Sequence, residues 1–248
     1  MRLIAHAITP APRPRVAVRG LRGRPLEWLE SAGLGIWSTR WDTAEPLARD
    51  DVLDHHRVIE GICAATPCLP VRFGTAFADA AAARATLDRR SDALRDALAR
   101  VSGRSEIAVT LLWREPSGDS APRPPVDDAA GPGRRFLEER QARWSASDAR
   151  RRQAAELVER LVATLAVEPA LVRHEICSSE RVAVSLAVLS PTDQAPDQIA
   201  SLRRFLAGLS DVTGVVNGPW PPYTFAGIDE SGGVSAGSAT RLPGWPPA

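Results

Sequence analysis

The sequence contains no lysine, so arginine supplies all 31 basic side chains other than histidine. These nearly cancel the 30 acidic residues, and a formal net charge of +1 does not favour nucleic acid or an anionic membrane as a partner. The bias to arginine is more typical of a GC-rich genome than of a binding function. No apolar run approaches the roughly 18 to 20 residues that cross a bilayer, and MRLIAHAITP lacks the apolar core of a signal peptide. We therefore expect a cytoplasmic protein that binds neither nucleic acid nor membrane.

Cysteine is scarce, with only Cys63, Cys68 and Cys177 in 248 residues. An odd number of cysteines in a chain without an export signal predicts reduced, mostly buried thiols. His55 and His56 lie close in sequence to the first two cysteines, which are common zinc ligands. However, four residues separate Cys63 from Cys68 and no second ligand pair follows, so the spacing predicts no metal site.

Motifs that would indicate catalysis are also missing. The sequence has no phosphate-binding loop, no dinucleotide fingerprint and no nucleophile elbow. HEIC at 174–177 lacks the second histidine of a zinc protease, and His174 on the same strand as Cys177 is poorly placed as its base. We expect no enzyme and no cofactor.

The first part of the chain predicts a sheet covered on one face by helices. Short β-branched or aromatic runs predict strands, and apolar residues at three- to four-residue spacing predict helices. The expected strands are 2–9, 16–18, 33–41, 68–74 and 106–113; the expected helices begin at Asp50 or Asp51 and near Ala83. These elements form an N-terminal α+β domain over residues 1–114.

The second part predicts another α+β domain. Residues 115–133 have the Pro/Gly-rich composition of a linker. A long helix over 134–167, a hairpin of strands at 171–178 and 181–190, a further helix and a last strand are compatible with a ferredoxin-like arrangement over 134–226. Residues 227–248 have the composition of a flexible tail.

Two short segments are candidates for a functional site. In LPVRFGTAF, Arg72 stands among apolar residues beside Phe73 and Gly74; it is either solvent-facing or held for a partner or an internal carboxylate such as Glu106. NGPWPPYTF combines rigid prolines with Trp220, Tyr223 and Phe225. This segment is either a recognition tail or, as we favour, a clasp that closes the second domain or joins it to the first.

Three segments in order resemble the gas vesicle protein family GvpL/GvpF: HHRVIEGICAATPCLPVRFGTAF at 55–77, LRDALARVSGRSEIAVTLLW at 94–113 and GVVNGPWPPYTF at 214–225. The resemblance implies two α+β domains, the second a modified ferredoxin-like fold, in a minor gas vesicle component. It also implies that the protein binds the hydrophobic shell protein GvpA, together with other gas vesicle accessory proteins, and prevents GvpA from aggregating during vesicle nucleation. Localisation at the gas vesicle follows from the same resemblance.

Two other interpretations stay open. A ferredoxin-like RNA- or ligand-binding module would display aromatics on its sheet within a basic surround, whereas aromatics make up 5% of this chain. A small-molecule enzyme would bring His55, His56 or Cys177 together in one pocket, and the expected elements place His55 and Cys177 in separate domains.

Overall fold

The computed structural model describes residues 1–114, 132–165, 167–177 and 181–227. The chain forms two compact units. Unit 1 contains residues 1–106 and 189–195 together with the described residues from Gly218 onward, and unit 2 contains the described residues of 107–188 and 196–217. The expected domains ended at residues 114 and 226, whereas unit 1 takes up chain from both ends of the sequence. The expected linker and tail lie almost entirely outside the described residues.

Unit 1 is built on a sheet with the strand order β2-β3-β1-β4 and with β5 also paired to β1. The strands are β1 (Arg2–Pro10), β2 (Leu26–Ser31), β3 (Leu34–Trp41), β4 (Leu69–Pro70) and β5 (Ala76–Phe77). All pairings in this sheet are antiparallel. The expected strand at 16–18 is wrong, because these residues pair with no strand; Val16 and Val18 pack against the core instead.

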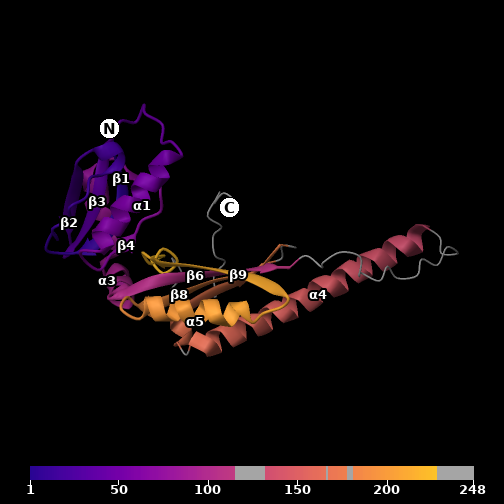
Figure 1. The fold of residues 1–248 in the computed structure, drawn as a ribbon. Coiled ribbons are helices and arrows are strands. Elements are labelled where there is room, and N and C mark those ends of the chain that lie inside the picture. The colour runs from indigo at the N-terminus through magenta and orange to yellow at the C-terminus, as the bar shows by residue number, and fades with distance from the viewer. Residues whose placement is uncertain (115–131, 166, 178–180, 228–248) are drawn as a thin grey trace. The chain divides into compact units, whose positions relative to one another are not determined.

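Helix α1 (Asp50–Cys63) confirms the predicted amphipathic helix and packs its buried side against β1 (Figure 1). Val58, Ile59 and Ile62 join Ala7 of β1 and Trp37 of β3 in one core cluster. Gly61 faces Val18 so closely that a β-carbon at this position would overlap the valine side chain. The glycine therefore allows the segment before β2 to lie directly on the helix.

The thiols expected at Cys63 and Cys68 are instead joined in a disulfide. The end of α1 and the turn after it bring the two Cα atoms to 5.3 Å, which lies within the usual range for a disulfide. The expectation of reduced thiols rested on composition alone and could not anticipate this local geometry.

The segment expected as one strand over 68–74 is interrupted. Only Leu69 and Pro70 form β4, and a turn follows in which the Thr75 amide donates to the Arg72 carbonyl at 3.1 Å. Gly74 has a φ of +85°, a conformation that a side chain would strain. Arg72 therefore lies in an exposed turn rather than within the sheet.

The helix expected near Ala83 forms as two helices, α2 (Ala80–Arg89) and α3 (Ser91–Val101), which meet at Arg90. Asp79 caps α2 because its carboxylate accepts from the Ala82 amide at 2.8 Å. The apolar positions predicted to face inward, among them Ala83, Leu87 and Leu94, are buried.

Unit 2 centres on a four-stranded sheet in the order β7-β8-β6-β9. Its strands are β6 (Arg104–Trp113), β7 (Val172–Ile176), β8 (Val182–Pro191) and β9 (Val212–Trp220). With α4 (Pro132–Leu165) and α5 (Ala195–Ala207) between them, the chain follows the β-α-β-β-α-β path of a ferredoxin-like fold. The strand that sequence analysis assigned to the first sheet, β6, thus supplies the missing first strand of this fold.

Both helices lie on the same face of this sheet (Figure 1). The C-terminal half of α4 buries Leu157, Leu161 and Leu165, which recur at four-residue spacing. Helix α5 buries Ile199, Leu202 and Leu206 in the same way. The predicted α+β class, with two sheets and a long helix, is confirmed.

The contact of Gly61 with Val18 predicts the effect of Gly61→Ala. Helix propensity alone would favour alanine by about 1 kcal/mol, but the added methyl overlaps Val18, and overpacking a core costs about 1–3 kcal/mol. We expect a net loss in the free energy of unfolding, measured by chemical denaturation. In a Val18→Ala background the same change should become neutral or stabilising; an equal loss in both backgrounds would show that Val18 is not the cause.

Candidate functional site

The candidate site is formed where the end of the described chain packs on unit 1. Residues 218–227, here called the C-terminal strap, begin within the last three residues of β9 and belong to unit 1. Tyr223 packs against the core cluster of α1 and β1, and Phe225 is only 3% exposed. The NGPWPPYTF segment therefore contributes to the packing of the N-terminal unit.

Tyr223 is the only tyrosine of the chain, and its hydroxyl lies 2.6 Å from Nδ1 of His56. On its other side the His56 ring places Nε2 3.3 Å from the Glu60 carboxylate. A carboxylate only accepts, so Nε2 carries the hydrogen and Nδ1 accepts from the tyrosine. Burial, together with the charges of Glu60 and Glu106, raises the pKa of Tyr223, so its hydroxyl keeps the proton that it donates. Trp220 meets the same imidazole edge-on, with ring centroids 5.3 Å apart.

Thr224 anchors the strap a second time, on the buried carboxylate of Glu106 in β6. Its amide and its hydroxyl each donate to one Glu106 oxygen at 2.7 Å. Burial raises the pKa of Glu106 to about 6, and the two bonds from Thr224 act in the opposite direction. A charge buried at neutral pH is thus held by two donors from a single strap residue.

A second chain of hydrogen bonds runs through the core from His55. The His55 Nε2 lies 2.9 Å from the Val71 carbonyl, and its Nδ1 lies 2.9 Å from Nδ1 of His6. The carbonyl only accepts, so Nε2 of neutral His55 donates, and the hydrogen between the two Nδ1 atoms belongs to His6. The other His6 nitrogen then accepts from the Thr39 hydroxyl at 2.7 Å. Every group in this series of hydrogen bonds has a partner when both imidazoles are neutral.

Neutrality of these imidazoles follows from their burial. His6 is fully buried and His55 is 3% exposed. Burial and the neighbouring His55 lower the pKa of His6 to about 3, and burial lowers the pKa of His55 as well. A proton added to His55 would go to Nδ1 and set two N–H groups against each other at the shared contact, whereas a proton added to His6 would go to Nε2 and displace the hydrogen that it accepts from Thr39. The pair therefore works as a fixed structural link at neutral pH.

The two adjacent histidines of α1 connect the segments that carry the family resemblance. Phe73 meets the His55 ring edge-on at 5.3 Å, while Trp220 and Tyr223 meet His56. The candidate residues of the RFGT turn and of the strap are thus brought to neighbouring positions on one helix. Arg72 and Gly74 of the same turn are exposed, and the Glu106 oxygens proposed as a partner for Arg72 are bound by Thr224 instead.

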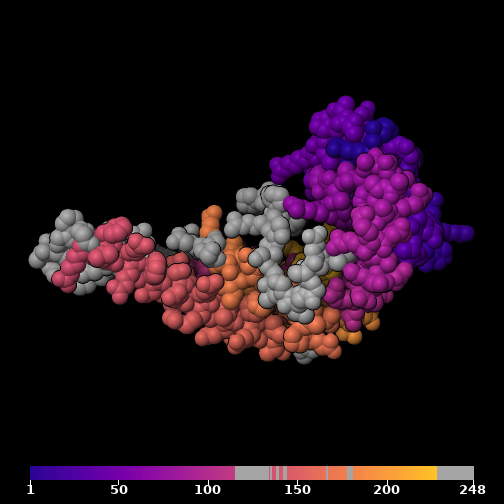
Figure 2. Space-filling model, turned by 180° about the vertical axis from the view of Figure 1, so that it is seen from behind, coloured from indigo at the N-terminus to yellow at the C-terminus, as the bar shows by residue number. Residues whose placement is uncertain are grey.

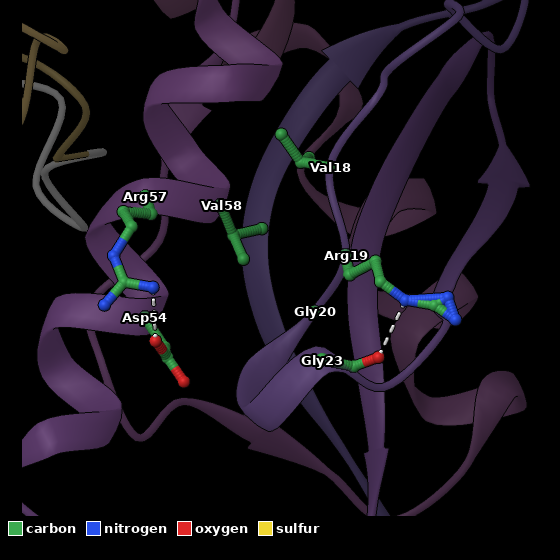
Figure 3. A pocket seen from close by; sticks show the side chains of 7 residues that line it. All are labelled: Val18, Arg19, Gly20, Gly23, Asp54, Arg57 and Val58. Atoms are coloured by element: carbon green, nitrogen blue, oxygen red, sulfur yellow. Dashed lines mark hydrogen bonds and ion pairs between the residues drawn. The ribbon is translucent and has the colours of Figure 1, made fainter.

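A surface hollow of about 270 Å³ lies between the loop at Val18–Gly23 and α1 (Figure 3). Its polar groups bond one another: Arg57 pairs with Asp54 at 2.9 Å, and Arg19 donates to the Gly23 carbonyl at 3.0 Å. The hollow is therefore explained by the contact of this loop with the helix, and nothing in its lining singles out a ligand.

The geometry of the strap supports packing and binding more than bond chemistry. Within the described part of the chain, no three His, Cys, Asp or Glu side chains converge to hold a metal ion. Cys177 lies in unit 2 and His55 in unit 1. None of the described helices combines the length and the apolar character needed to cross a membrane.

Sequence reasoning missed His6 and Thr39 as partners of His55, and Thr224 as the partner of Glu106. The available signals were the adjacent histidines and a lone glutamate within an apolar strand. Neither signal identifies its partner, because these contacts join residues 49 and 118 positions apart.

Solved structures with the same fold are gas vesicle proteins. GvpF from Microcystis aeruginosa superposes with a TM-score of 0.72 at 16% identity over 92% of this chain and 99% of that one. GvpF from Anabaena sp. PCC7120 superposes with a TM-score of 0.70 at 21% identity, over 92% of this chain and 98% of that one. At these identities the likeness concerns the fold, which is an α+β architecture with two antiparallel sheets and a long helix.

The sequence comparisons extend this to the family. The model of the gas vesicle synthesis protein GvpL/GvpF matches residues 3–227. Gas vesicle protein L2 of Halobacterium salinarum is 32% identical over 201 residues, covering 71% of this chain and 70% of that protein. Gas vesicle protein F2 of the same organism is 25% identical over 75% and 73% of the two chains. The chain belongs to the GvpL/GvpF family of gas vesicle proteins.

The lowered pKa of His6 predicts how stability depends on pH. An unfolded histidine titrates near 6.5, so between pH 6.5 and about 3 the unfolded chain binds a proton that folded His6 does not. The free energy of unfolding should therefore decrease as the pH is lowered from 6.5 to about 3. His6 should contribute up to about 1.4 kcal/mol per pH unit to this decrease. In chemical denaturation measured at a series of pH values, His6→Gln should make the free energy of unfolding depend less on pH. Glutamine keeps one acceptor and one donor but does not titrate. The exposed His174→Gln serves as control and should leave the slope unchanged.

The Glu106 anchor predicts the opposite sign. Because the pKa of Glu106 is raised in the folded state, the folded chain binds more protons than the unfolded chain between pH 4.5 and 6. The charge of Glu106 therefore costs stability above pH 6. Glutamine can accept from the Thr224 amide and donate to its hydroxyl, so Glu106→Gln should gain stability relative to the wild type from pH 5 to pH 7, by up to about 2 kcal/mol. Glu106→Ala leaves both donors without an acceptor and should lose about 1–3 kcal/mol. Equal effects of the two substitutions would contradict the anchor.

Proposed function

We propose that this protein acts in gas vesicle assembly by binding the shell protein GvpA and preventing its aggregation. Membership in the GvpL/GvpF family over residues 3–227 is the observation that carries this proposal. The role is that of an accessory protein at the gas vesicle, without catalysis and without a cofactor. Other gas vesicle accessory proteins are further expected partners. The alternative of an RNA- or ligand-binding module has no comparable support.

A physical reason for such a protein follows from the shell subunit. A very hydrophobic subunit that assembles into a shell exposes apolar surface and strand edges before assembly, and these associate with one another unless they are covered. A binding protein must therefore offer apolar surface of its own. It must also keep a well-packed fold beneath that surface, since otherwise it would aggregate with its client.

We place this surface on the outer side of α1. Val52 and Leu53 are 43% and 58% exposed, although the same helix buries Val58, Ile59 and Ile62 on its inner side. His56 lies three to four residues further on, and Trp220 of the strap packs against its ring. We call Val52, Leu53, His56 and Trp220 the α1 face. It joins exposed apolar side chains to the site that the strap stabilises.

Co-expression with tagged protein and measurement of the GvpA retained in the soluble pull-down fraction tests this proposal. Val52→Ser with Leu53→Ser should lower retention about tenfold or more, because burying each such side chain contributes roughly 1.5–3 kcal/mol. The matched control is Val215→Ser, since Val215 has a similar exposure of 42% but lies on β9.

Failure of the wild-type chain to retain GvpA would overturn the proposed function. Loss of retention in Val215→Ser, with the α1 double variant unaffected, would overturn only the placement on α1. Unchanged melting temperatures in all three proteins are required, and the exposure of the substituted side chains makes this the expected result.

A further inference from the structure

The described apolar side chains in the N-terminal half of α4 lie outside the buried core of unit 2. Helix α4 runs from Pro132 to Leu165, and Ala154 is the first of its described side chains to be buried. The described side chains between Arg134 and Arg152 are all exposed, and Figure 2 shows this part of α4 extending away from the surface of α5 and of its own C-terminal end. A solvated helix of this length has no need of large apolar side chains.

Three large apolar side chains nevertheless occur there. Phe136, Leu137 and Trp144 are 56%, 64% and 67% exposed, more than any other large apolar side chain among the described residues of unit 2. Leu137 and Trp144 are seven residues apart and Phe136 and Trp144 eight, so at 3.6 residues per turn all three lie on one side of the helix. They form a stripe about two turns long, whose spacing is that of a helix-binding seam.

The charges around this stripe are mostly positive. Between Arg134 and Arg152 the sequence has seven arginines and three acidic residues. Arg140 lies on the same side as the stripe, and its guanidinium stacks over the Trp144 ring at 5.6 Å from the centroid. Arg151 follows on that side about two turns after Trp144. A partner that covers the stripe is therefore met by guanidinium groups.

We propose that this α4 face, formed by Phe136, Leu137, Arg140 and Trp144, binds an amphipathic helix of a partner protein whose apolar side is flanked by acidic residues. The apolar stripe would pack into the apolar side of that helix in the manner of two paired helices. Arg140, held by Trp144, would pair with a carboxylate, and the surrounding arginines would favour association with an acidic partner.

Charge argues against two other partners for the α4 face, a second copy of this chain and a lipid surface. A second copy of this chain would bring one arginine-rich segment against another, and like charges facing each other disfavour the contact. A lipid surface would place the stripe among acyl chains, where Arg140 within the stripe would have no carboxylate to pair with. The acidic residues Glu138, Glu139 and Asp148 of the same segment also weaken attraction to anionic lipid.

Calorimetric titration of the full-length protein tests the proposal with a designed probe. The probe is a synthetic helix of about three heptads with leucine at the two core positions and glutamate at the flanking positions, which keeps it from pairing with itself. The comparison peptide carries lysine in place of glutamate. We expect the acidic peptide to bind at least about tenfold more tightly than the basic one, with an affinity that falls as salt rises.

Variants then locate the contact. Phe136→Ser with Trp144→Ser should weaken binding of the acidic peptide at least about tenfold, and Arg140→Gln should narrow the preference for the acidic peptide over the basic one. Ala149→Ser, on another side of the same exposed segment, should change neither quantity. Because all these side chains are exposed, helical content by circular dichroism should be the same throughout.

Equal binding of the two peptides, no binding of either, or an affinity unchanged by Phe136→Ser with Trp144→Ser would each overturn the proposal. Binding to anionic phospholipid vesicles without binding of the acidic peptide would also overturn the proposal, if Phe136→Ser with Trp144→Ser abolishes the vesicle binding. Self-association measured by sedimentation would do the same, if this double variant abolishes it. The α4 face is separate from the α1 face, so GvpA retention by the double variant distinguishes failure here from failure of the proposed function.

Discussion

The hydrogen bond from the Tyr223 hydroxyl to the His56 ring closes unit 1, since it ties residues 167 positions apart in the sequence. It orients the imidazole on which Trp220 packs, and it brings Thr224 to the buried Glu106. Without this contact the strap would leave a buried carboxylate and an apolar helix side without cover. The proposed α1 face depends on it as well, because Trp220 and His56 belong to both.

Histidine, glutamate and tyrosine side chains close together would ordinarily suggest catalysis, yet here each is used to satisfy another buried group. His6 and His55 remain neutral because burial lowers their pKa, and every nitrogen has a partner in that state. Glu106 is buried with two donors. Polar groups arranged in this way fix one packing of the core, since a rearranged core would leave them unpaired. A rigid scaffold is what a protein needs if it is to expose apolar side chains and stay folded.

Local patterns predicted the elements better than their partners. The spacing of Val52, Ile59 and Cys63 was enough to predict α1, although Val52 is 43% exposed, and the apolar run of β6 was enough to predict a strand. It could not show that β6 pairs with β8 and β9, because those strands follow more than 60 residues later. β2 was missed since LEWLES carries two glutamates and a serine, and Val16 and Val18 were mistaken for a strand because β-branched residues also suit a segment packed on Gly61. The site residues were found by type, but their pairing is set by the tertiary fold.

The central claim is that the C-terminal strap is part of the cooperative core of unit 1. Native-state amide hydrogen exchange on the full chain tests it most directly. We expect the amides of Trp220, Tyr223, Thr224 and Phe225 to open with nearly the same free energy as those of α1, and Tyr223→Phe to lower both opening free energies together. Strap amides that exchange at the rate of an unstructured peptide, while α1 stays protected, would contradict the claim.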